Sequence, residues 1–247
     1  MKDFSNLKIG VVGANGRMGL QVQEVLKDYG ITCIKEGTIN EIFNNADLVI
    51  DFSSAEGLEE CLQSAQRTGK TLVSGSTPMS DELMKKIQET SKHAKICWSA
   101  NMSLGIALMK KVAEMLAKSL PENEFDSEIL EAHHSQKADA PSGTAVAIGK
   151  VIAKGRGVSF NDKAVLTKST DYKRKKGDIG FASIRGGSIF GQHSAMFIGQ
   201  SEQTTISHEA FNRKIFAEGA VKCALKLLDK TQNGFYTVED LMFNDQN

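Results

Sequence analysis

Proton-carrying side chains are concentrated in one short segment, Glu131–Ala145. The adjacent histidines His133 and His134 are followed by Lys137, and then by Ser142-Gly143-Thr144 at the start of an apolar stretch. Histidine and lysine side chains donate protons in catalysis. Backbone N–H groups at a glycine-opened helix start attract an anion, most simply a carboxylate. The segment therefore predicts a site that transfers protons and binds a substrate carboxylate at Gly143 and Thr144.

The two histidines need not have the same role. Residues 126–134 alternate as in a β-strand, where successive side chains face opposite ways. His133 then shares a face with Glu131, and His134 faces the other side, so one histidine is expected at the reaction and the other in substrate binding or packing. Because the alternation loosens at the end of a strand, an arrangement in which both histidines reach one cleft is the alternative. Adjacent histidines seldom chelate a metal, and no Cys/His spacing resembles a zinc site, so no metal is expected.

A glycine-rich turn near the start of the chain predicts a second ligand. Gly13, Gly16 and Gly19 lie between the apolar run 7–12 and a segment with helical periodicity. Glycine lets the backbone turn tightly and approach a pyrophosphate, which the N-terminus of the following helix then binds. The pattern predicts dinucleotide binding, with Arg17 able to reach a phosphate. A βα turn with a purely structural role is the alternative.

The residue that holds the adenosine ribose is expected at the end of the second strand. Glu36 fits this role, about 17 residues after Gly19. Lys35, its neighbour, suits the 2′-phosphate of NADPH instead. The pair leaves the choice between NADH and NADPH open, and both side chains are alternatively surface residues that follow a strand.

Hydrophobic patterning predicts the elements that position these groups. Strands are expected at 7–12, 31–34, 47–52, 71–74 and 95–99, and helices at 20–29, 55–68 and 80–91. This alternation predicts an α/β domain with a parallel sheet and helices on both of its faces. Small or polar residues follow three of the strands and are expected to line a single crevice: 51–53, 75–77 and 99–102.

The pattern changes after Asn101. A long helix is expected at 104–120, a strand at 126–134, a helix at 142–154, antiparallel hairpins within 177–208, a helix at 214–228 and a short capped helix after Thr237. This half therefore reads as α+β. The basic run 173–176 is expected either to be a solvated loop or to contact an anionic ligand.

Composition narrows the class of protein. The chain has 247 residues with 40% apolar and 24% charged residues, as expected for a globular protein. Lys+Arg and Asp+Glu are both 30, and this lack of a basic excess argues against a nucleic-acid partner. No apolar run approaches a membrane span. The four cysteines are scattered without a C-x-x-C pair, which is typical of free thiols in the cytoplasm.

Together these motifs resemble those of the dihydrodipicolinate reductase family, also called 4-hydroxy-tetrahydrodipicolinate reductases. The resemblance rests on Gly13-x-x-Gly16-Arg17-Met18-Gly19 and on Glu131-Ala132-His133-His134-x-x-Lys137-x-Asp139-Ala140-Pro141-Ser142-Gly143-Thr144-Ala145. It continues through Gly180–Arg185 and Gly191–Phe197, and so covers essentially the whole chain.

The resemblance implies an architecture and an activity. A Rossmann-like dinucleotide-binding domain would comprise residues 1–103, completed by 213–247, and an α+β domain with an open mixed sheet, residues 104–212, would bind substrate and form a homotetramer. The activity would be NADH- or NADPH-dependent reduction of the dicarboxylate 4-hydroxy-tetrahydrodipicolinate to tetrahydrodipicolinate, in the diaminopimelate route to lysine.

The resemblance also implies roles for individual residues. His133 would be the proton donor and acceptor, Lys137 a proton donor, and His134, Gly143 and Thr144 would bind substrate. The expected cofactor contacts are Gly13, Ala14, Asn15, Gly16, Arg17, Met18, Glu36, Gly75, Ser76, Thr77, Ser99, Ala100, Asn101 and Met102. The family more usually has Gly-Thr-Thr at 75–77, and Ser76 keeps the hydroxyl.

Two other functions are the alternatives. Another two-domain dehydrogenase, acting on an amino acid or a sugar, would share the first domain but not the His-His-x-x-Lys and Ser-Gly-Thr combination. A non-catalytic dinucleotide sensor would need no cluster of titratable side chains.

Overall fold

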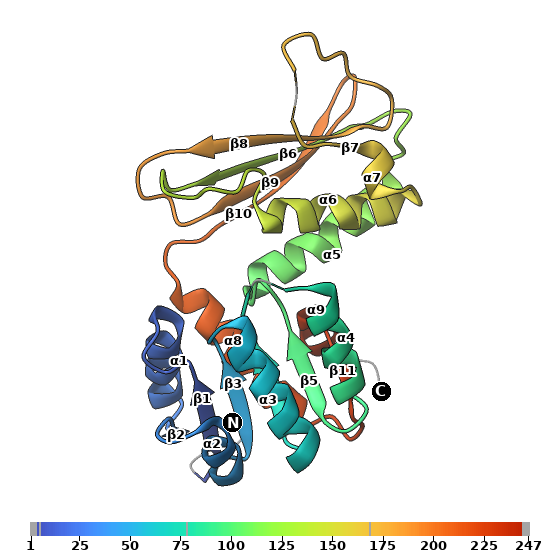
Figure 1. The fold of residues 1–247 in the computed structure, drawn as a ribbon. Helices are drawn as coiled ribbons and strands as arrows, with labels where there is room; N and C mark the ends of the chain where they lie inside the picture. Colours follow the sequence, from blue (N-terminus) through green and yellow to red (C-terminus); the bar gives the residue numbers. More distant parts are fainter. Residues whose placement is uncertain (1–3, 5, 78, 168, 244–247) are drawn as a thin grey trace. The chain divides into compact units, whose positions relative to one another are not determined.

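The computed structural model describes residues 4, 6–77, 79–167 and 169–243. The chain divides into two compact units (Figure 1). Unit 1 comprises Met1–Leu104 and Arg213–Asn247, and unit 2 comprises Gly105–Asn212. The domain boundary expected from the sequence falls one residue earlier, between 103 and 104. Residues 1–3, 5 and 244–247 of the expected dinucleotide-binding domain lie outside the described part of the chain.

Unit 1 is built on a parallel sheet with the strand order β11-β5-β4-β3-β1-β2. Its strands are β1 (Lys8–Val12), β2 (Thr32–Ile34), β3 (Leu48–Asp51), β4 (Thr71–Ser74), β5 (Lys95–Trp98) and β11 (Gly234–Tyr236). Its helices are α1 (Arg17–Asp28), α2 (Ile39–Asn45), α3 (Ala55–Thr68), α4 (Asp81–Thr90), α8 (Lys214–Leu228) and α9 (Val238–Phe243). The expected parallel α/β sheet is confirmed.

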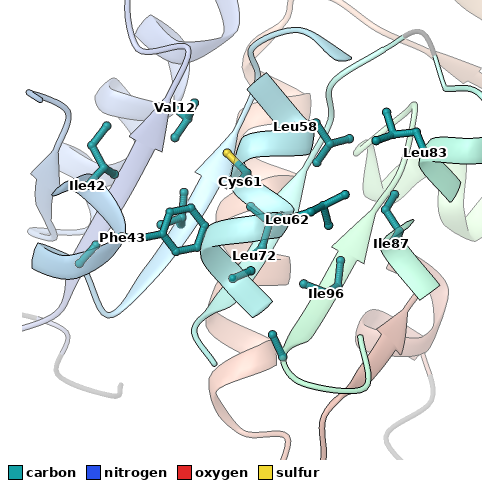
Figure 2. Close-up of a cluster of buried hydrophobic side chains, with 14 residues drawn as sticks. Val12, Ile42, Phe43, Leu58, Cys61, Leu62, Leu72, Leu83, Ile87 and Ile96 are labelled. Carbon is teal, nitrogen blue, oxygen red and sulfur yellow. The ribbon is translucent and has the colours of Figure 1, made fainter. Parts of the chain in front are cut away.

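The core of unit 1 explains why these strands are nearly continuous apolar runs. Every residue of β3 and β4 is buried, because helices cover both faces of a parallel sheet. On one face, Figure 2 shows Leu58, Cys61 and Leu62 of α3 packed among side chains of α2, α4 and the sheet. Their helical spacing places them on one side of α3.

Two short elements of unit 1 were not expected. Thr38 caps α2 through reciprocal hydrogen bonds with Glu41, and this Thr-x-x-Glu capping box is a local signal of the sequence. The strand β11 has only three residues, and it joins the sheet edge by pairing in parallel with β5. A strand of three residues has too short a pattern to be predicted locally, and it forms because it pairs with β5.

Unit 2 contains a mixed sheet with the order β10-β9-β6-β8-β7. Its strands are β6 (Asp126–His133), β7 (Ala164–Val165), β8 (Ile179–Arg185), β9 (Gln192–Ile198) and β10 (Gln203–Glu209). The helices α5 (Leu104–Ser119) and α6 (Gly143–Arg156) lie along one face, and α7 (Phe160–Lys163) precedes β7 (Figure 1). No helix in the described part of the chain is long and apolar enough to cross a membrane.

One expectation about this sheet is wrong. β8 and β9 do not form an antiparallel hairpin, because β6 lies between them and pairs in parallel with β8. The hairpin of β9 with β10 is antiparallel as expected. β6 carries buried side chains along most of its length, including Ser127 and Ile129, so it takes the central position that a more exposed strand cannot.

Candidate active site

In unit 1, the glycine-rich turn has the geometry of an anion cradle. Gly13 has a φ of +76°, and a Cβ there would lie 2.4 Å from the carbonyl oxygen of Phe52. A Cβ on Gly19 would lie 2.2 Å from the carbonyl oxygen of Gly13, so α1 approaches the turn as closely as backbone allows. Gly16, the N-cap of α1, provides no side-chain cap, and the first turn has no acidic residue. The N-terminus of α1 is therefore suited to a phosphate.

A cleft of about 300 Å³ opens beside this turn. It is lined by Arg17, Met18, Phe52, Ser53, Gly75, Ser76, Thr77 and Arg213. The structure thus brings together five of the expected cofactor residues from two segments of the chain. Arg213 was missed, because nothing local in the sequence relates it to residues near the other end of the chain.

A buried carboxylate fixes the wall of this cleft. Asp51, at the end of β3, accepts hydrogen bonds from the hydroxyls of Ser53, Ser74 and Ser76, at 2.5, 2.7 and 2.8 Å. Burial raises the pKa of Asp51, and these hydrogen bonds act in the opposite direction. The Ser76 hydroxyl also accepts from the backbone N–H of Ser53 at 2.8 Å, so it serves the loop structure itself.

The remaining cofactor residues lie at other strand ends of unit 1. Glu36 and Lys35 are both exposed just after β2, and the Lys35 ammonium donates to the Gln23 side chain of α1 at 3.0 Å. After β5, the Ser99 hydroxyl donates to the Asn101 carbonyl at 2.8 Å.

Ala100 and Met102, which also follow β5, differ in exposure. Ala100 is exposed, whereas the Met102 side chain is 1% exposed. A Cβ on Gly219 of α8 would lie 1.8 Å from the Met102 carbonyl oxygen. Met102 is therefore a core residue of unit 1 whose side chain is not accessible to a ligand.

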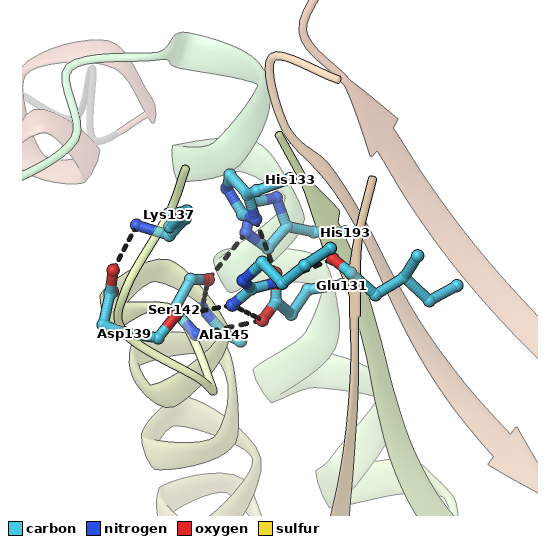
Figure 3. Close-up of polar contacts among 9 residues, drawn as sticks. Glu131, His133, Lys137, Asp139, Ser142, Ala145 and His193 are labelled. Carbon is cyan, nitrogen blue, oxygen red and sulfur yellow. Dashed lines mark hydrogen bonds and ion pairs between the residues drawn. The ribbon is translucent and has the colours of Figure 1, made fainter. Parts of the chain in front are cut away.

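In unit 2, the central strand β6 presents Glu131 and His133 on one face, as the alternation predicts. His133 Nδ1 lies 2.5 Å from Glu131 Oε2 (Figure 3). The neighbouring strands complete the cluster, because Arg185 of β8 is in register with His133 and His193 of β9 is in register with Glu131. The Arg185 guanidinium donates to both carboxylate oxygens of Glu131, at 2.6 and 2.9 Å.

The Glu131 carboxylate is fully ionised by its surroundings. Burial by itself raises the pKa of Glu131, but hydrogen bonds from Arg185, Ser183 and His133 outweigh it and lower that pKa to about 2. The backbone N–H of Ser142 also donates to it at 3.2 Å. A carboxylate that is ionised at neutral pH only accepts hydrogen bonds, so Nδ1 of His133 carries the hydrogen in this pair and Nε2 is left for chemistry.

The two buried histidines are neutral near pH 7. Burial lowers the pKa of His133, while the Glu131 carboxylate acts in the opposite direction. Burial is the main cause that lowers the pKa of His193 to about 4, and the positive charge that His133 carries when protonated is the second. Ser142 Oγ accepts from the backbone N–H of Ala145 and forms a hydrogen bond of 3.1 Å with His193 Nε2. The rings of His133 and His193 meet edge to face, with centroids 5.1 Å apart.

Lys137 extends this cluster towards the start of α6. Its ammonium lies 2.7 Å from Asp139 Oδ1 (Figure 3), and its charge contributes to lowering the pKa of His133. Asp139 also accepts from the backbone of Gly143, and the hydrogen bond from Lys137 is the main cause of its lowered pKa. Ser142 is the N-cap of α6, and its hydroxyl accepts from the backbone of the first turn. The Lys137 ammonium and the first turn of α6 therefore share a carboxylate ligand.

The other expected substrate residues lie near this group. His134 and Thr144 are half-buried, one directly after β6 and the other in the first turn of α6. Four further residues of the cluster belong to the sequence motifs but were not expected in the site: Glu131, Ser142, Arg185 and His193. The pairing of β6 with β8 and β9 brings Arg185 and His193 to Glu131 and His133.

The basic run 173–176 has a structural role at the opposite end of β6. Arg174 forms ion pairs with Asp126 and Glu128 and donates to the carbonyl oxygens of Ser127 and Asp178. Its charge is compensated by acidic residues of β6, so this arginine anchors the loop to the sheet.

Family models of known proteins match both units, and both models describe the same enzyme family. A family model described as dihydrodipicolinate reductase, C-terminus, matches residues 105–242, and the corresponding N-terminus model matches residues 26–102. The chain is 37% identical to the 4-hydroxy-tetrahydrodipicolinate reductase of Campylobacter jejuni subsp. doylei, over 96% of this chain and 97% of that protein. It is also 37% identical to the enzyme of that name from Wolbachia pipientis subsp. Culex pipiens, over 97% and 92%.

A solved structure has the same fold. It is the dipicolinate-bound dihydrodipicolinate reductase from Paenisporosarcina sp. TG-14, with a TM-score of 0.76. Sequence identity is 19%, and the match covers 94% of this chain and 97% of the other.

Proposed function

The chain belongs to the dihydrodipicolinate reductase family, and from this premise we infer its activity. It is an oxidoreductase that uses NADH or NADPH to reduce 4-hydroxy-tetrahydrodipicolinate to tetrahydrodipicolinate, a step of lysine and diaminopimelate biosynthesis. The reaction consumes a hydride and a proton and releases water.

The observation that carries this function in unit 2 is the Glu131–His133 pair. A neutral histidine whose Nδ1–H is held by an ionised carboxylate has Nε2 available to accept and then donate a proton. We assign the proton exchange to His133, and a second proton donor to Lys137. His134, Gly143 and Thr144 are assigned to the substrate, whose carboxylate would take the position beside Lys137 that Asp139 holds.

Unit 1 fits the dinucleotide. When bound, the nicotinamide supplies the hydride. The uncapped N-terminus of α1, the close backbone at Gly13 and Gly19 and the guanidinium of Arg17 would hold the phosphates. Further contacts are assigned to Ala14, Asn15, Gly16, Met18, Gly75, Ser76, Thr77, Ser99, Ala100, Asn101 and the backbone of Met102.

The choice of nucleotide depends on the exposed pair after β2. Glu36 would accept the ribose hydroxyls of NADH, and Lys35 would pair with the 2′-phosphate of NADPH. We propose that Glu36 binds the ribose, because the Lys35 ammonium donates to Gln23 in this structure, and that either NADH or NADPH supplies the hydride.

The domain roles, assembly and location are also proposals. Residues 1–103 with 213–247 would bind the nucleotide, and residues 104–212 would bind substrate and form a homotetramer. Large apolar side chains that are exposed in unit 2 support an association of copies: Leu108, Met115, Ile184, Phe190 and Phe211. All four cysteines are free thiols, which supports a cytoplasmic location. Sedimentation velocity would test the tetramer.

The activity is tested by following the nicotinamide absorbance. Purified protein is mixed with the condensation product of aspartate semialdehyde and pyruvate, with NADH or NADPH in separate cuvettes. Oxidation that depends on this product supports the reductase, and the two kcat/KM values measure the nucleotide preference. Absence of oxidation in protein that binds NAD(P)H would instead favour another dicarboxylate or a dinucleotide sensor.

A further inference from the structure

Gly191 lies against the free nitrogen of His133, and its backbone conformation does not require glycine. It is buried just before β9, and its carbonyl accepts a hydrogen bond from Ala210 at 2.9 Å. Its φ is outside the left-handed region, so an L-residue could adopt the same backbone. The constraint at this position is therefore space.

The space in question is the volume beside Nε2. A Cβ at position 191 would lie 3.1 Å from His133 Nε2 and 3.4 Å from Cδ2 of the same ring, and 3.8 Å from a ring carbon of His193. The first of these distances is shorter than an ordinary van der Waals contact. A methyl group here would push the ring or cover the nitrogen.

His133 has little freedom to move aside. Its Nδ1 is held 2.5 Å from Glu131, and that carboxylate is itself clamped by Arg185. The His193 ring packs edge-on at 5.1 Å between centroids. Displacement of the imidazole would lengthen the hydrogen bond to Glu131, so the ring and position 191 compete for the same volume.

We propose that Gly191 is a positioning residue for the reductase: the absence of a side chain keeps His133 in its Glu131-bonded orientation and leaves Nε2 uncovered for proton exchange. The inference deepens the proposed function and rests on it for the role of His133. Gly191 touches no reacting atom in this scheme and acts only through the imidazole.

The test compares Gly191→Ala with Gly186→Ala. Gly186 also lies outside the left-handed region, and a Cβ there would meet no atom within 4 Å, so it is a matched control in the same unit. We expect Gly191→Ala to lower kcat about tenfold, a partial loss of a general acid–base contribution of roughly 10²–10⁴. The KM for NADH should stay unchanged, and Gly186→Ala should behave as the unmodified protein.

A second readout follows the ring directly. Side-chain nitrogen NMR of the histidines, recorded against pH, reports the tautomer and titration of His133. The charged or titratable groups that face it are Glu131 on β6, Arg185 on β8, His193 on β9 and Lys137 in the following loop. Gly191→Ala should move the His133 Nε2 resonance and its titration midpoint, and Gly186→Ala should move neither.

A double-mutant cycle separates a local clash from general damage. In a His133→Ala background the added methyl has room, so Gly191→Ala should cause no further loss of turnover or of Tm. A further loss there, or equal behaviour of Gly191→Ala and Gly186→Ala, overturns the proposal. Full activity of His133→Ala would overturn the proposed role of His133 instead, and the NMR comparison tells the two failures apart.

Discussion

Arg185 lies directly opposite His133 on the neighbouring parallel strand, and both side chains donate hydrogen bonds to the same buried carboxylate, Glu131. This shared acceptor gives the two residues different tasks. Arg185 keeps the carboxylate ionised, and the carboxylate in turn orients the imidazole. The histidine therefore enters the reaction with its tautomer already selected.

The ionised Glu131 predicts a specific acid dependence of stability. Its folded-state pKa of about 2 lies below the ordinary value of 4.5, so it stabilises the fold above pH 4.5 and loses this effect as the pH falls towards 2. Glu131→Gln should therefore be less stable than the unmodified protein at pH 7, with a difference that shrinks on acidification. Urea unfolding at several pH values measures it, with the exposed Glu202→Gln as control. A difference that is constant with pH would contradict the lowered pKa.

Removing Arg185 should cost more than removing an exposed ion-pair partner. Arg185→Ala leaves a carboxylate of 1% exposure without its main counter-charge, and breaking a buried pair in this way typically costs about 3–5 kcal/mol. Lys118→Ala, which removes an ion pair from the surface of α5, should change the free energy of unfolding by less than about 1 kcal/mol. Denaturant unfolding of both variants makes the comparison, and equal effects would show that Arg185 is dispensable for the fold.

The proton-donor assignment predicts unequal effects of neighbouring substitutions. His133→Ala and Lys137→Ala should each lower kcat by about 10²-fold or more, as general acid–base groups do. Gln136→Ala is the control, because this exposed side chain lies in the same turn. Steady-state kinetics measure the kcat of each variant. A near-normal kcat in His133→Ala or Lys137→Ala would contradict the role proposed for that residue. A change at Thr144 should mainly raise the KM for the dicarboxylate.

The glycine turn offers a comparison between two residues of positive φ. An alanine at Gly13 would clash with the Phe52 carbonyl, whereas at Gly30, with φ of +68°, a Cβ meets nothing within 4 Å. Both substitutions carry the backbone cost of the left-handed region, about 1–2 kcal/mol. We expect only Gly13→Ala to weaken NADH binding, as measured by fluorescence titration. Equal weakening in both would mean that backbone strain, rather than the shape of the cradle, controls affinity.

Local sequence determined those features of the protein that depend on near neighbours along the chain. The spacing of Gly13, Gly16 and Gly19 between a strand and a helix predicted the cradle, because the positive φ of Gly13 and the approach of Gly19 to the Gly13 carbonyl involve only near neighbours along the chain. Period-two alternation placed Glu131 and His133 on one face, and in the structure the two side chains are also in contact. The family resemblance rested on these same short motifs.

Tertiary structure decided which distant segments became neighbours. The position of β6 between β8 and β9 contradicted the hairpin expected there, and this pairing brings Arg185, His193 and Gly191 to the imidazole. Arg213 likewise reaches the cleft of unit 1 from far along the chain. Periodicity records which face of a strand is buried, but it does not record which strand lies beside it. Strand order depends on burial and pairing over the whole sheet, so it is seen in the folded structure and not in the local pattern of any one strand.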